Sequence, residues 1–257
     1  MIYLKTHKEI DLMRESSLLV ARTHAELAKV IKPGINSLSL DKLAEEFIRD
    51  NGGIPAFKGY NNFPYTLCVS ADSEVVHGLP SEKVIREGTI LSVDCGVLMN
   101  GFYGDSAFTY PVGDISNEKV QLLDVTREAL DRAVLSATCG NTIGDIGYTI
   151  QRFTEDFGYS VVKELVGHGI GQQLHEAPEV PNYGIKGKGT VLEEGMVLAI
   201  EPMINIGSAG VLQKKDGWTI VTQDGSPSAH FEYTVAIKKD VTEILSPFNL
   251  IENVLKK

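Results

Sequence analysis

Apolar residues recur at the spacing of an amphipathic helix in two pairs of segments, one pair in each half of the chain. The first pair predicts a long helix over residues 7–32 and a second helix that begins at Ser37 or Ser39 and runs to Arg49. Each of these helices stops at a glycine-containing turn. The second pair predicts helices over residues 117–138 and 143–157.

Short runs rich in β-branched and apolar residues lie between these helices. They predict strands over residues 65–70, 89–94, 106–111, 196–201 and 230–237. Helices and strands alternate throughout, and no low-complexity linker divides the chain. The pattern therefore predicts an α/β or α+β protein.

The second half of the chain repeats the first. Residues 87–94 form a Glu-Gly turn and an apolar strand that ends on Asp94, and residues 194–201 repeat this order and end on Glu201, at an offset of 107. A second block repeats at an offset of 106, in which Gly34, Leu40, Phe47, Asp50 and Gly52 correspond to Gly140, Ile146, Phe153, Asp156 and Gly158. We therefore expect two halves, approximately residues 1–112 and 113–257, that share one curved sheet and one site.

Composition narrows the class of protein. The 257 residues, 43% of them hydrophobic, supply a sizeable core, and the net charge of −10 argues against nucleic-acid binding. An acidic protein suits a cationic substrate such as a free peptide amino terminus. Three widely spaced cysteines without a CxxC pair exclude a disulfide framework. With no signal peptide and no membrane-spanning stretch, the sequence predicts a cytoplasmic protein.

Four carboxylates occupy corresponding places in the two halves. Asp94 ends one predicted strand and Asp105 begins the next, so a hairpin brings them side by side. Glu201 and Glu232 repeat the arrangement, separated by 31 residues instead of 11. Two acids on adjacent strands repel each other unless a cation lies between them. Any one acid alone is as well explained by an exposed strand end, but four in duplicated positions indicate a site.

Three histidines lie in turns marked by glycine or proline. His168 stands between two glycines, which let an imidazole approach a bulky group closely, and His175 and His77 lie in similar turns. A lone histidine is more often structural than a ligand, and we take His7, His24 and His230 as structural or surface residues.

Four carboxylates and one imidazole are hard ligands that suit a pair of divalent ions such as Mn(II), Fe(II) or Co(II) better than a single structural zinc. Two ions about 3.5 Å apart lower the pKa of a shared water and generate hydroxide near neutral pH. The predicted chemistry is therefore hydrolysis.

These residues are similar to a known motif set. The chain resembles the type I methionine aminopeptidases, M24 metallopeptidases with the α+β pita-bread fold, over essentially its whole length. The motifs that carry the resemblance are Val76-His77-Gly78-Leu79-Pro80, Asp94-Cys95-Gly96, Gly104-Asp105-Ser106-Ala107, Gly167-His168-Gly169-Ile170-Gly171, Ala199-Ile200-Glu201-Pro202 and His230-Phe231-Glu232. The implied fold has two halves, related by a pseudo-two-fold axis, that share a curved antiparallel sheet with helices on its outer face.

The resemblance also implies the role of each site residue. Asp94 would chelate one of two divalent ions (Co, Mn, Fe or Zn), Asp105 and Glu232 would bridge both, and His168 and Glu201 would complete the second ion's ligands. Glu201 would also shuttle a proton. His77 and His175 would contact the peptide and stabilise the tetrahedral intermediate. The methionine pocket would be formed by Phe57, Tyr60, Phe63, Cys68, Leu174 and Trp218, although plain core packing explains any one of these equally well.

Two departures from the family pattern stand near this pocket. Asp72-Ser73 replaces an expected Asn-Glu at a backbone-held monovalent-cation site, and Asn62 replaces a usual glycine at the rim. Neither departure touches the proposed metal ligands.

The expected substrates are nascent polypeptides with an N-terminal methionine and a small second residue, a role that allows a transient contact with the ribosome. The lack of a coiled coil or an exposed apolar stripe favours a monomer. The alternatives are a prolidase or aminopeptidase P, which typically carry an extra N-terminal domain, a pita-bread binding module that has lost its metals, and an α/β protein with coincidental acids.

Overall fold

Capping side chains set where the long helices begin. The computed structural model describes residues 1–256. Thr6 and Glu9 form a capping box before α1, the Asn36 side chain accepts a hydrogen bond from the Ser39 N–H, and Thr142 and Asp145 repeat the capping box in the second half. The helices are α1 (His7–Ala28), α2 (Ser37–Asp50), α3 (Asn117–Ser136), α4 (Ile143–Glu155), a short α5 (Asn249–Leu255) and the 3₁₀ turn η1 (Tyr60–Asn62).

Predicted and observed helices differ mainly at their ends. Helix α1 stops four residues before the predicted residue 32, because Lys29 already donates its N–H to the carbonyls of Glu26 and Leu27. The sequence pattern does not anticipate α5. Among residues 1–256, no helix is long and apolar enough to cross a membrane.

The strands are β1 (Ile54–Pro55), β2 (Leu67–Ala71), β3 (Glu74–Val76), β4 (Thr89–Met99), β5 (Phe102–Val112), β6 (Ser160–Val161), β7 (Gly167–Gly169), β8 (Glu176–Val180), β9 (Val197–Ile200), β10 (Met203–Asn205), β11 (Val211–Gln213), β12 (Ile220–Thr222), β13 (Ser228–His230), β14 (Tyr233–Ala236) and β15 (Glu243–Ile244). The predicted strand over 89–94 extends to Met99. The predicted strand over 230–237 is wrong as a single element, because Phe231 and Glu232 separate β13 from β14, which belong to different sheets.

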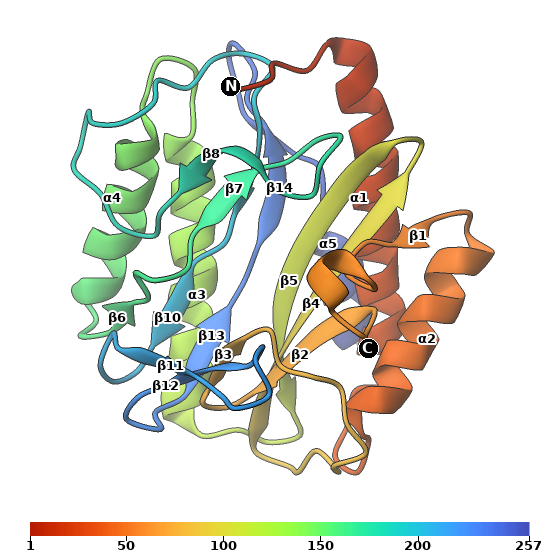
Figure 1. Cartoon of the computed structure of the whole chain (residues 1–257). Coiled ribbons are helices and arrows are strands. Elements are labelled where there is room, and N and C mark those ends of the chain that lie inside the picture. Colours follow the sequence, from red (N-terminus) through yellow and green to blue (C-terminus); the bar gives the residue numbers. More distant parts are fainter. Residues whose placement is uncertain (257) are drawn as a thin grey trace.

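Two antiparallel sheets form the centre of the fold. In the first half, β4 pairs with β2 on one side and with β5 on the other, and in the second half β9 pairs with β7 and β14 in the same way. Strands β5 and β14 lie next to each other where the halves meet (Figure 1).

Two threonine side chains join β5 to β13 and β14 across this junction. Thr234 Oγ1 donates to the carbonyl of Asp105 and accepts from its N–H, at 2.7 and 3.1 Å. Thr109 Oγ1 does the same for His230, at 2.7 and 3.0 Å. Between them, the Glu232 N–H donates to the Ala107 carbonyl. The two halves therefore meet through a reciprocal set of bonds centred on these carboxylate-bearing strands.

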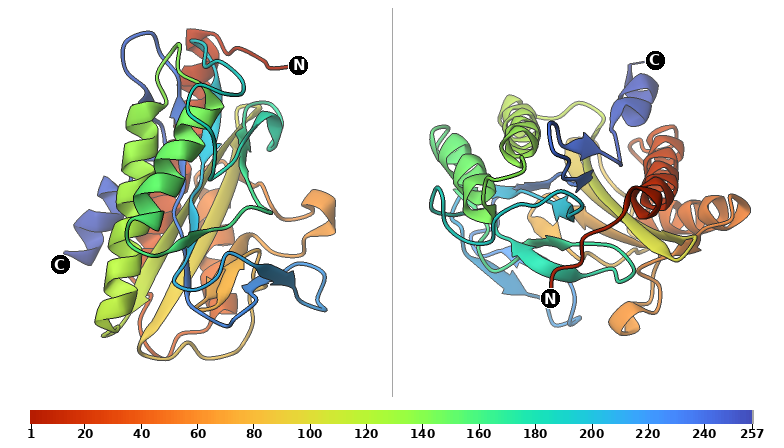
Figure 2. Two further views of the ribbon diagram at one scale, coloured as in Figure 1. Left: turned by 90° about the vertical axis from the view of Figure 1, so that its left-hand side faces the viewer. Right: turned by 90° about the horizontal axis from the view of Figure 1, so that it is seen from above.

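Corresponding contacts appear in both halves at the offsets found in the sequence. Asn36 forms an isolated bridge with Val84, and Thr142 forms one with Val191. Helices α1 and α2 lie over the first sheet, and α3 and α4 lie over the second, all on the same outer side (Figure 2). The observed architecture confirms the predicted α+β pita-bread fold. A division of the chain near residue 112 stays a prediction.

Candidate metal centre and substrate pocket

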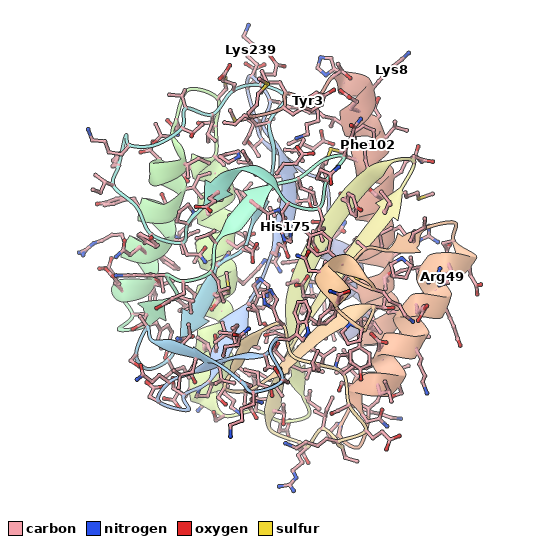
Figure 3. All side chains as sticks on the ribbon, in the orientation of Figure 1. Tyr3, Lys8, Arg49, Phe102, His175 and Lys239 are labelled. Atoms are coloured by element: carbon pink, nitrogen blue, oxygen red, sulfur yellow. The ribbon has the colours of Figure 1, made fainter. Side chains whose placement is uncertain are left out.

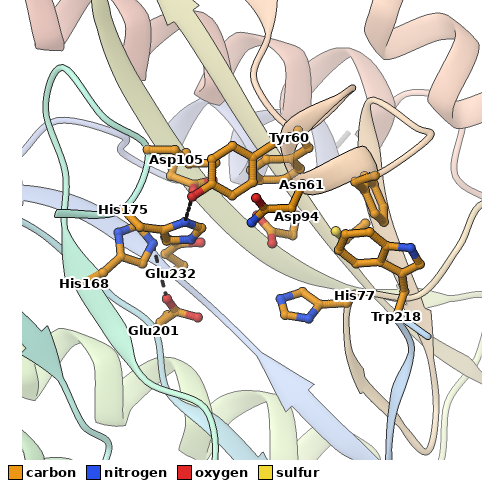
Figure 4. Close-up of a pocket in the computed structure, with 14 residues that line it drawn as sticks. Tyr60, Asn61, His77, Asp94, Asp105, His168, His175, Glu201, Trp218 and Glu232 are labelled. Carbon is orange, nitrogen blue, oxygen red and sulfur yellow. Dashed lines mark hydrogen bonds and ion pairs between the residues drawn. The ribbon is translucent and has the colours of Figure 1, made fainter. Parts of the chain in front are cut away.

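One pocket gathers the side chains singled out in the sequence. Its volume is about 190 Å³, which is smaller than the roughly 300–1,000 Å³ typical of drug-sized ligand sites. It is lined by Phe57, Tyr60, Asn61, Phe63, Cys68, His77, Asp94, Asp105, His168, Leu174, His175, Glu201, Trp218 and Glu232 (Figure 4). The structure thus brings together every candidate metal, catalytic and methionine-pocket residue.

The β4–β5 hairpin holds the first two carboxylates on one face. Asp94 pairs with Ala107 and Asp105 pairs with Gly96, so the two acids are diagonal neighbours two positions apart. They are therefore on adjacent strands as predicted, but not directly opposite each other. In the second half, Tyr233 pairs with Ile200, which places Glu201 and Glu232 at neighbouring positions just beyond the paired residues.

His168 enters the site from β7. Its Nδ1 lies 2.9 Å from the carbonyl of Gly169, which selects the tautomer with the proton on Nδ1. Nε2 is left without that proton and lies 3.7 Å from Glu201 Oε1. Ligand atoms of Asp105, His168 and Glu232 all lie within 4.8 Å of one another. An imidazole with a free Nε2 beside two carboxylates is a donor set for a divalent ion.

Burial and mutual repulsion perturb every acid in this group. Burial raises the pKa of Asp94 to about 7 and that of Glu201 to about 8. Burial, reinforced by the neighbouring carboxylates, raises the pKa of Asp105 and Glu232 well above the usual range. Burial lowers the pKa of His168 to about 3, so its ring is neutral. Without a bound cation, it is therefore unfavourable for all four carboxylates to be ionised at once.

Unpaired oxygens indicate that the residues fit bound cations. Asp94 Oδ1 and Glu232 Oε1 are buried and, among the described residues, have no hydrogen-bond partner. Buried acceptors without partners are rare and costly. The donor set of oxygens and one imidazole nitrogen matches hard divalent ions. The candidate ligands are therefore chemically suited to the metals that the sequence predicts.

His175 and His77 reach the pocket from its edges. The Tyr60 hydroxyl lies 2.7 Å from His175 Nδ1, and the His175 ring stands edge-on to His168 with centroids 4.3 Å apart. His77 follows β3 with a φ of 57°, an uncommon left-handed conformation for a non-glycine residue. Burial lowers the pKa of His77 to about 4 and also lowers that of His175. Both rings are therefore neutral near pH 7.

The aromatic wall comes from segments far apart in the chain. Phe63 packs edge-on against Trp218, with ring centroids 5.0 Å apart. Phe57 covers Gly96, where an added Cβ would lie 2.6 Å from the phenyl ring, so a glycine is needed opposite Asp105 for the ring to pack there. Cys68 pairs with Asp94 across β2 and β4. The apolar wall and the carboxylates thus share the same strands.

Two residues at or beside the pocket, His230 and Asn61, were not among the predicted site residues. His230 is only 2% exposed, and its Nε2 lies 3.3 Å from Glu201 Oε2. It is therefore not a surface residue. Its position two residues before Glu232 was the signal, because alternate residues of an extended segment share a face. Asn61 was missed although it follows Tyr60 and lies close in sequence to Phe63.

The two departures from the family pattern have local structural explanations. Asp72 turns the chain between β2 and β3 with a φ of 50°, and its carboxylate pairs with Lys119 Nζ at 2.6 Å. Ser73 accepts the Thr222 N–H at its carbonyl. Asn62 has a φ of 68°, a conformation that favours glycine and that asparagine tolerates. Asn62 therefore keeps the backbone shape of the rim.

Comparison with known proteins matches the geometry. The model of metallopeptidase family M24 matches residues 11–239. Methionine aminopeptidase 1 of Bacillus subtilis is 50% identical over 246 residues, which cover 96% of this chain and 99% of the relative. Methionine aminopeptidase of Clostridium acetobutylicum is 49% identical over 247 residues, with 96% and 99% covered.

Solved structures give the same picture. A crystal structure of methionine aminopeptidase from Thermotoga maritima superposes with a TM-score of 0.94 at 46% identity, covering 96% of this chain and 99% of that one. The structure from Rickettsia prowazekii gives a TM-score of 0.95 at 39% identity, covering 96% and 100%. Prolidase from Pyrococcus furiosus shares the fold alone, with a TM-score of 0.79 at 24% identity, and the match spans 65% of its length.

Proposed function

The chain belongs to metallopeptidase family M24, and we propose from this premise which of its residues carry out the reaction. It is a methionine aminopeptidase, an enzyme that removes the N-terminal methionine from polypeptides. The observation that carries the assignment of residues is the single pocket in which five candidate metal ligands adjoin an apolar cavity.

The metal ligands are assigned by their place in the pocket, four carboxylates from the two hairpins and His168 from β7. Asp94, Asp105, His168, Glu201 and Glu232 would hold a pair of divalent ions, with Asp105 and Glu232 shared between them. When bound, a pair of divalent ions supplies a hydroxide near neutral pH and polarises the scissile carbonyl. The unpaired oxygens of Asp94 and Glu232 support this assignment.

The remaining steps fall to the protein's own side chains. Glu201 takes a proton on its carboxylate and returns it to the leaving amine. His77 and His175 donate hydrogen bonds to the substrate backbone and to the oxygen of the tetrahedral intermediate. Their neutral rings keep one N–H each for this purpose.

The apolar end of the pocket selects the side chain. Phe57, Tyr60, Phe63, Cys68, Leu174 and Trp218 enclose space for an unbranched thioether, and polarisable sulfur packs favourably against aromatic rings. A cavity of about 190 Å³ has room for one side chain and leaves little for a large neighbour. We therefore expect peptides with a small second residue to be preferred.

The wider setting follows from this activity. We propose that residues 1–257 form a single catalytic domain and that the protein is a cytoplasmic monomer acting on nascent chains, with transient ribosome contact and no nucleic-acid or membrane binding of its own. The working ions would be Co, Mn, Fe or Zn, with a monovalent cation held by backbone near Asp72 and Ser73. A prolidase activity is disfavoured because the chain is 24% identical to the prolidase but 50% and 46% identical to the methionine aminopeptidases.

Peptide hydrolysis tests the proposal. Metal-stripped protein is supplied with Mn(II), Fe(II), Co(II) or Zn(II), and free methionine is measured from Met-Ala-Ser and Met-Lys-Ser, with Ala-Pro as the prolidase control. We expect metal-dependent release from Met-Ala-Ser, little from Met-Lys-Ser and no cleavage of Ala-Pro. The Glu201→Gln variant should be inactive with every ion. A folded protein that releases no methionine with any of these ions would overturn the proposal.

A further inference from the structure

The N-terminal segment, residues 1–6, buries a charged side chain next to the catalytic loop. Lys5 is 5% exposed, and its Nζ lies 2.6 Å from Glu176 Oε2. Burying an ammonium group is unfavourable unless it is paired, and removing one partner leaves the other charge buried. The Lys5–Glu176 pair therefore links two segments separated by 171 residues in the sequence.

The partner carboxylate is itself fixed within the catalytic loop, residues 171–176. Glu176 Oε1 accepts the N–H of Gln173 at 3.1 Å. Gly171 faces the ion pair so closely that an added Cβ would lie 2.5 Å from Glu176 Oε1 and 2.6 Å from Lys5 Cε. The Gly171 carbonyl accepts the Tyr103 N–H, close to Asp105 in β5. The ion pair thus includes Glu176 at one end of this loop and packs against Gly171 at the other.

The N-terminal segment has its own anchors. The Lys5 N–H donates to the Gly195 carbonyl at 2.7 Å, in the turn that leads into β9 and Glu201. The next residue, Thr6, caps α1. The segment runs from α1 in the first half to the side of β7 and β8 in the second (Figure 2, right). Lys5 therefore connects the start of α1 in the first half to Glu176 and Gly195 in the second.

The loop that Lys5 holds carries His175, which directly precedes Glu176. His175 contacts the Tyr60 hydroxyl at 2.7 Å and faces the His168 ring, so a small shift of the loop removes it from the pocket. We propose that Lys5, through its ion pair with Glu176, is a positioning residue that keeps His175 aimed at the substrate. The proposal rests on the substrate-contacting role proposed for His175.

Substitutions of the pair test this role. Lys5→Met keeps the apolar stem and removes the charge, and Lys8→Met is the matched control, because Lys8 lies exposed on α1 and points away from the molecule (Figure 3). We expect Lys5→Met to lower kcat about tenfold or more with little change in KM, since misplaced catalytic groups affect the transition state most. Lys5→Arg should restore most of kcat, and Lys8→Met should match the unmodified protein.

Histidine side-chain NMR of the full-length chain supplies a readout independent of turnover. The His175 ring signals should shift or broaden in Lys5→Met, while those of His24, buried between α1 and β5, stay in place. If Lys5→Met folds poorly, Lys5→Met/Glu176→Gln removes both charges and should fold, yet should retain the low kcat and the altered His175 signals.

The outcomes separate this proposal from the proposed function. Unchanged His175 signals and an unchanged kcat in a folded Lys5→Met or double variant would overturn it. Equal losses in Lys5→Met and Lys8→Met would also overturn it, because they would indicate a general effect of charge. If the unmodified protein releases no methionine, the proposed function fails, and the NMR comparison still decides whether Lys5 positions His175.

Discussion

The two hairpins that supply the carboxylates differ in the length of their paired strands and in the connection between those strands. In the first, β4 and β5 pair over eleven residues each and are joined at Asn100-Gly101. In the second, β9 and β14 pair over four residues each, and the connection between them carries β10, β11, β12 and β13. Both hairpins therefore bring two acids into the pocket, one through a tight turn and the other through a long connection.

The longer connection accounts for what the second half adds. It brings Trp218 to the pocket and His230 to Glu201, and its strand β12 pairs with β3, which leads into His77. The first hairpin has no such insertion and instead packs its length against α1. The duplicated core thus supplies the candidate metal ligands, whereas the insertion adds Trp218 to the apolar wall and pairs with the strand before His77.

The largest effect should follow from neutralising either bridging carboxylate. We expect Asp105→Asn and Glu232→Gln each to lower kcat/KM by roughly 10³-fold, about 4 kcal/mol of lost transition-state stabilisation, because each residue is proposed to hold both ions. Methionine release from Met-Ala-Ser measures the loss, and Glu128→Gln, an exposed carboxylate on α3, is the control. Strongly unequal losses of kcat/KM in the two variants would show that the two hairpins do not contribute equally to catalysis.

A second large effect concerns pH and the metal-free protein. The acids of both hairpins have folded-state pKa values raised above their unfolded values, including about 7 for Asp94 and about 8 for Glu201. Their full contribution to stability is present below about pH 4 and is lost as pH rises through 7 to 8, at up to roughly 1.4 kcal/mol per group and pH unit.

Urea unfolding of the metal-free protein between pH 5 and pH 9 checks this sign. The free energy of unfolding should fall with rising pH and should recover when Mn(II) is added. The metal-free Asp105→Asn variant should show a weaker dependence on pH. A metal-free protein that becomes more stable toward pH 9 would contradict the electrostatic description.

Sequence patterns predicted much of the first hairpin and less of the second. The positions of Asp94 and Asp105 could be predicted from strand periodicity and one short turn, because residues close in the sequence determine the strands and the turn. The segment 230–237 looked like one strand, yet Phe231 and Glu232 leave the sheet where the halves meet, which only tertiary contacts with Ala107 and Thr109 specify. The place of His230 beside Glu201 depends on the same contacts. Lys5 carries no sequence signal, because its partner is 171 residues away.

A smaller effect should distinguish the two connections. Trp218→Ala removes the ring that packs on Phe63 in the longer connection, and we expect kcat/KM for Met-Ala-Ser to fall about tenfold through lost apolar contact with the methionine side chain. Asn100→Gly in the short turn keeps a residue suited to positive φ and should leave the kinetics unchanged. Equal effects of the two substitutions would refute a special role for the insertion.

The smallest effect tests the symmetry of the junction. Thr109→Val and Thr234→Val each remove two side-chain hydrogen bonds to the opposite strand, and we expect each to lower the free energy of unfolding by about 1–2 kcal/mol. Thermal or urea unfolding measures the change. Similar losses of unfolding free energy in the two variants would support equal contributions of the two halves to the junction. A loss in only one variant would show that one of the two threonines supplies most of the stabilisation.

Titration of Mn(II) into metal-stripped protein, with methionine release from Met-Ala-Ser followed in the same samples, is the most direct test of a shared site with two metal ions. We expect up to two Mn(II) per chain, release that appears as these sites fill, and loss of both binding and release in Asp105→Asn. Full release in the presence of a chelator, or Mn(II) binding unaffected by Asp105→Asn, would contradict a metal centre built from the two hairpins.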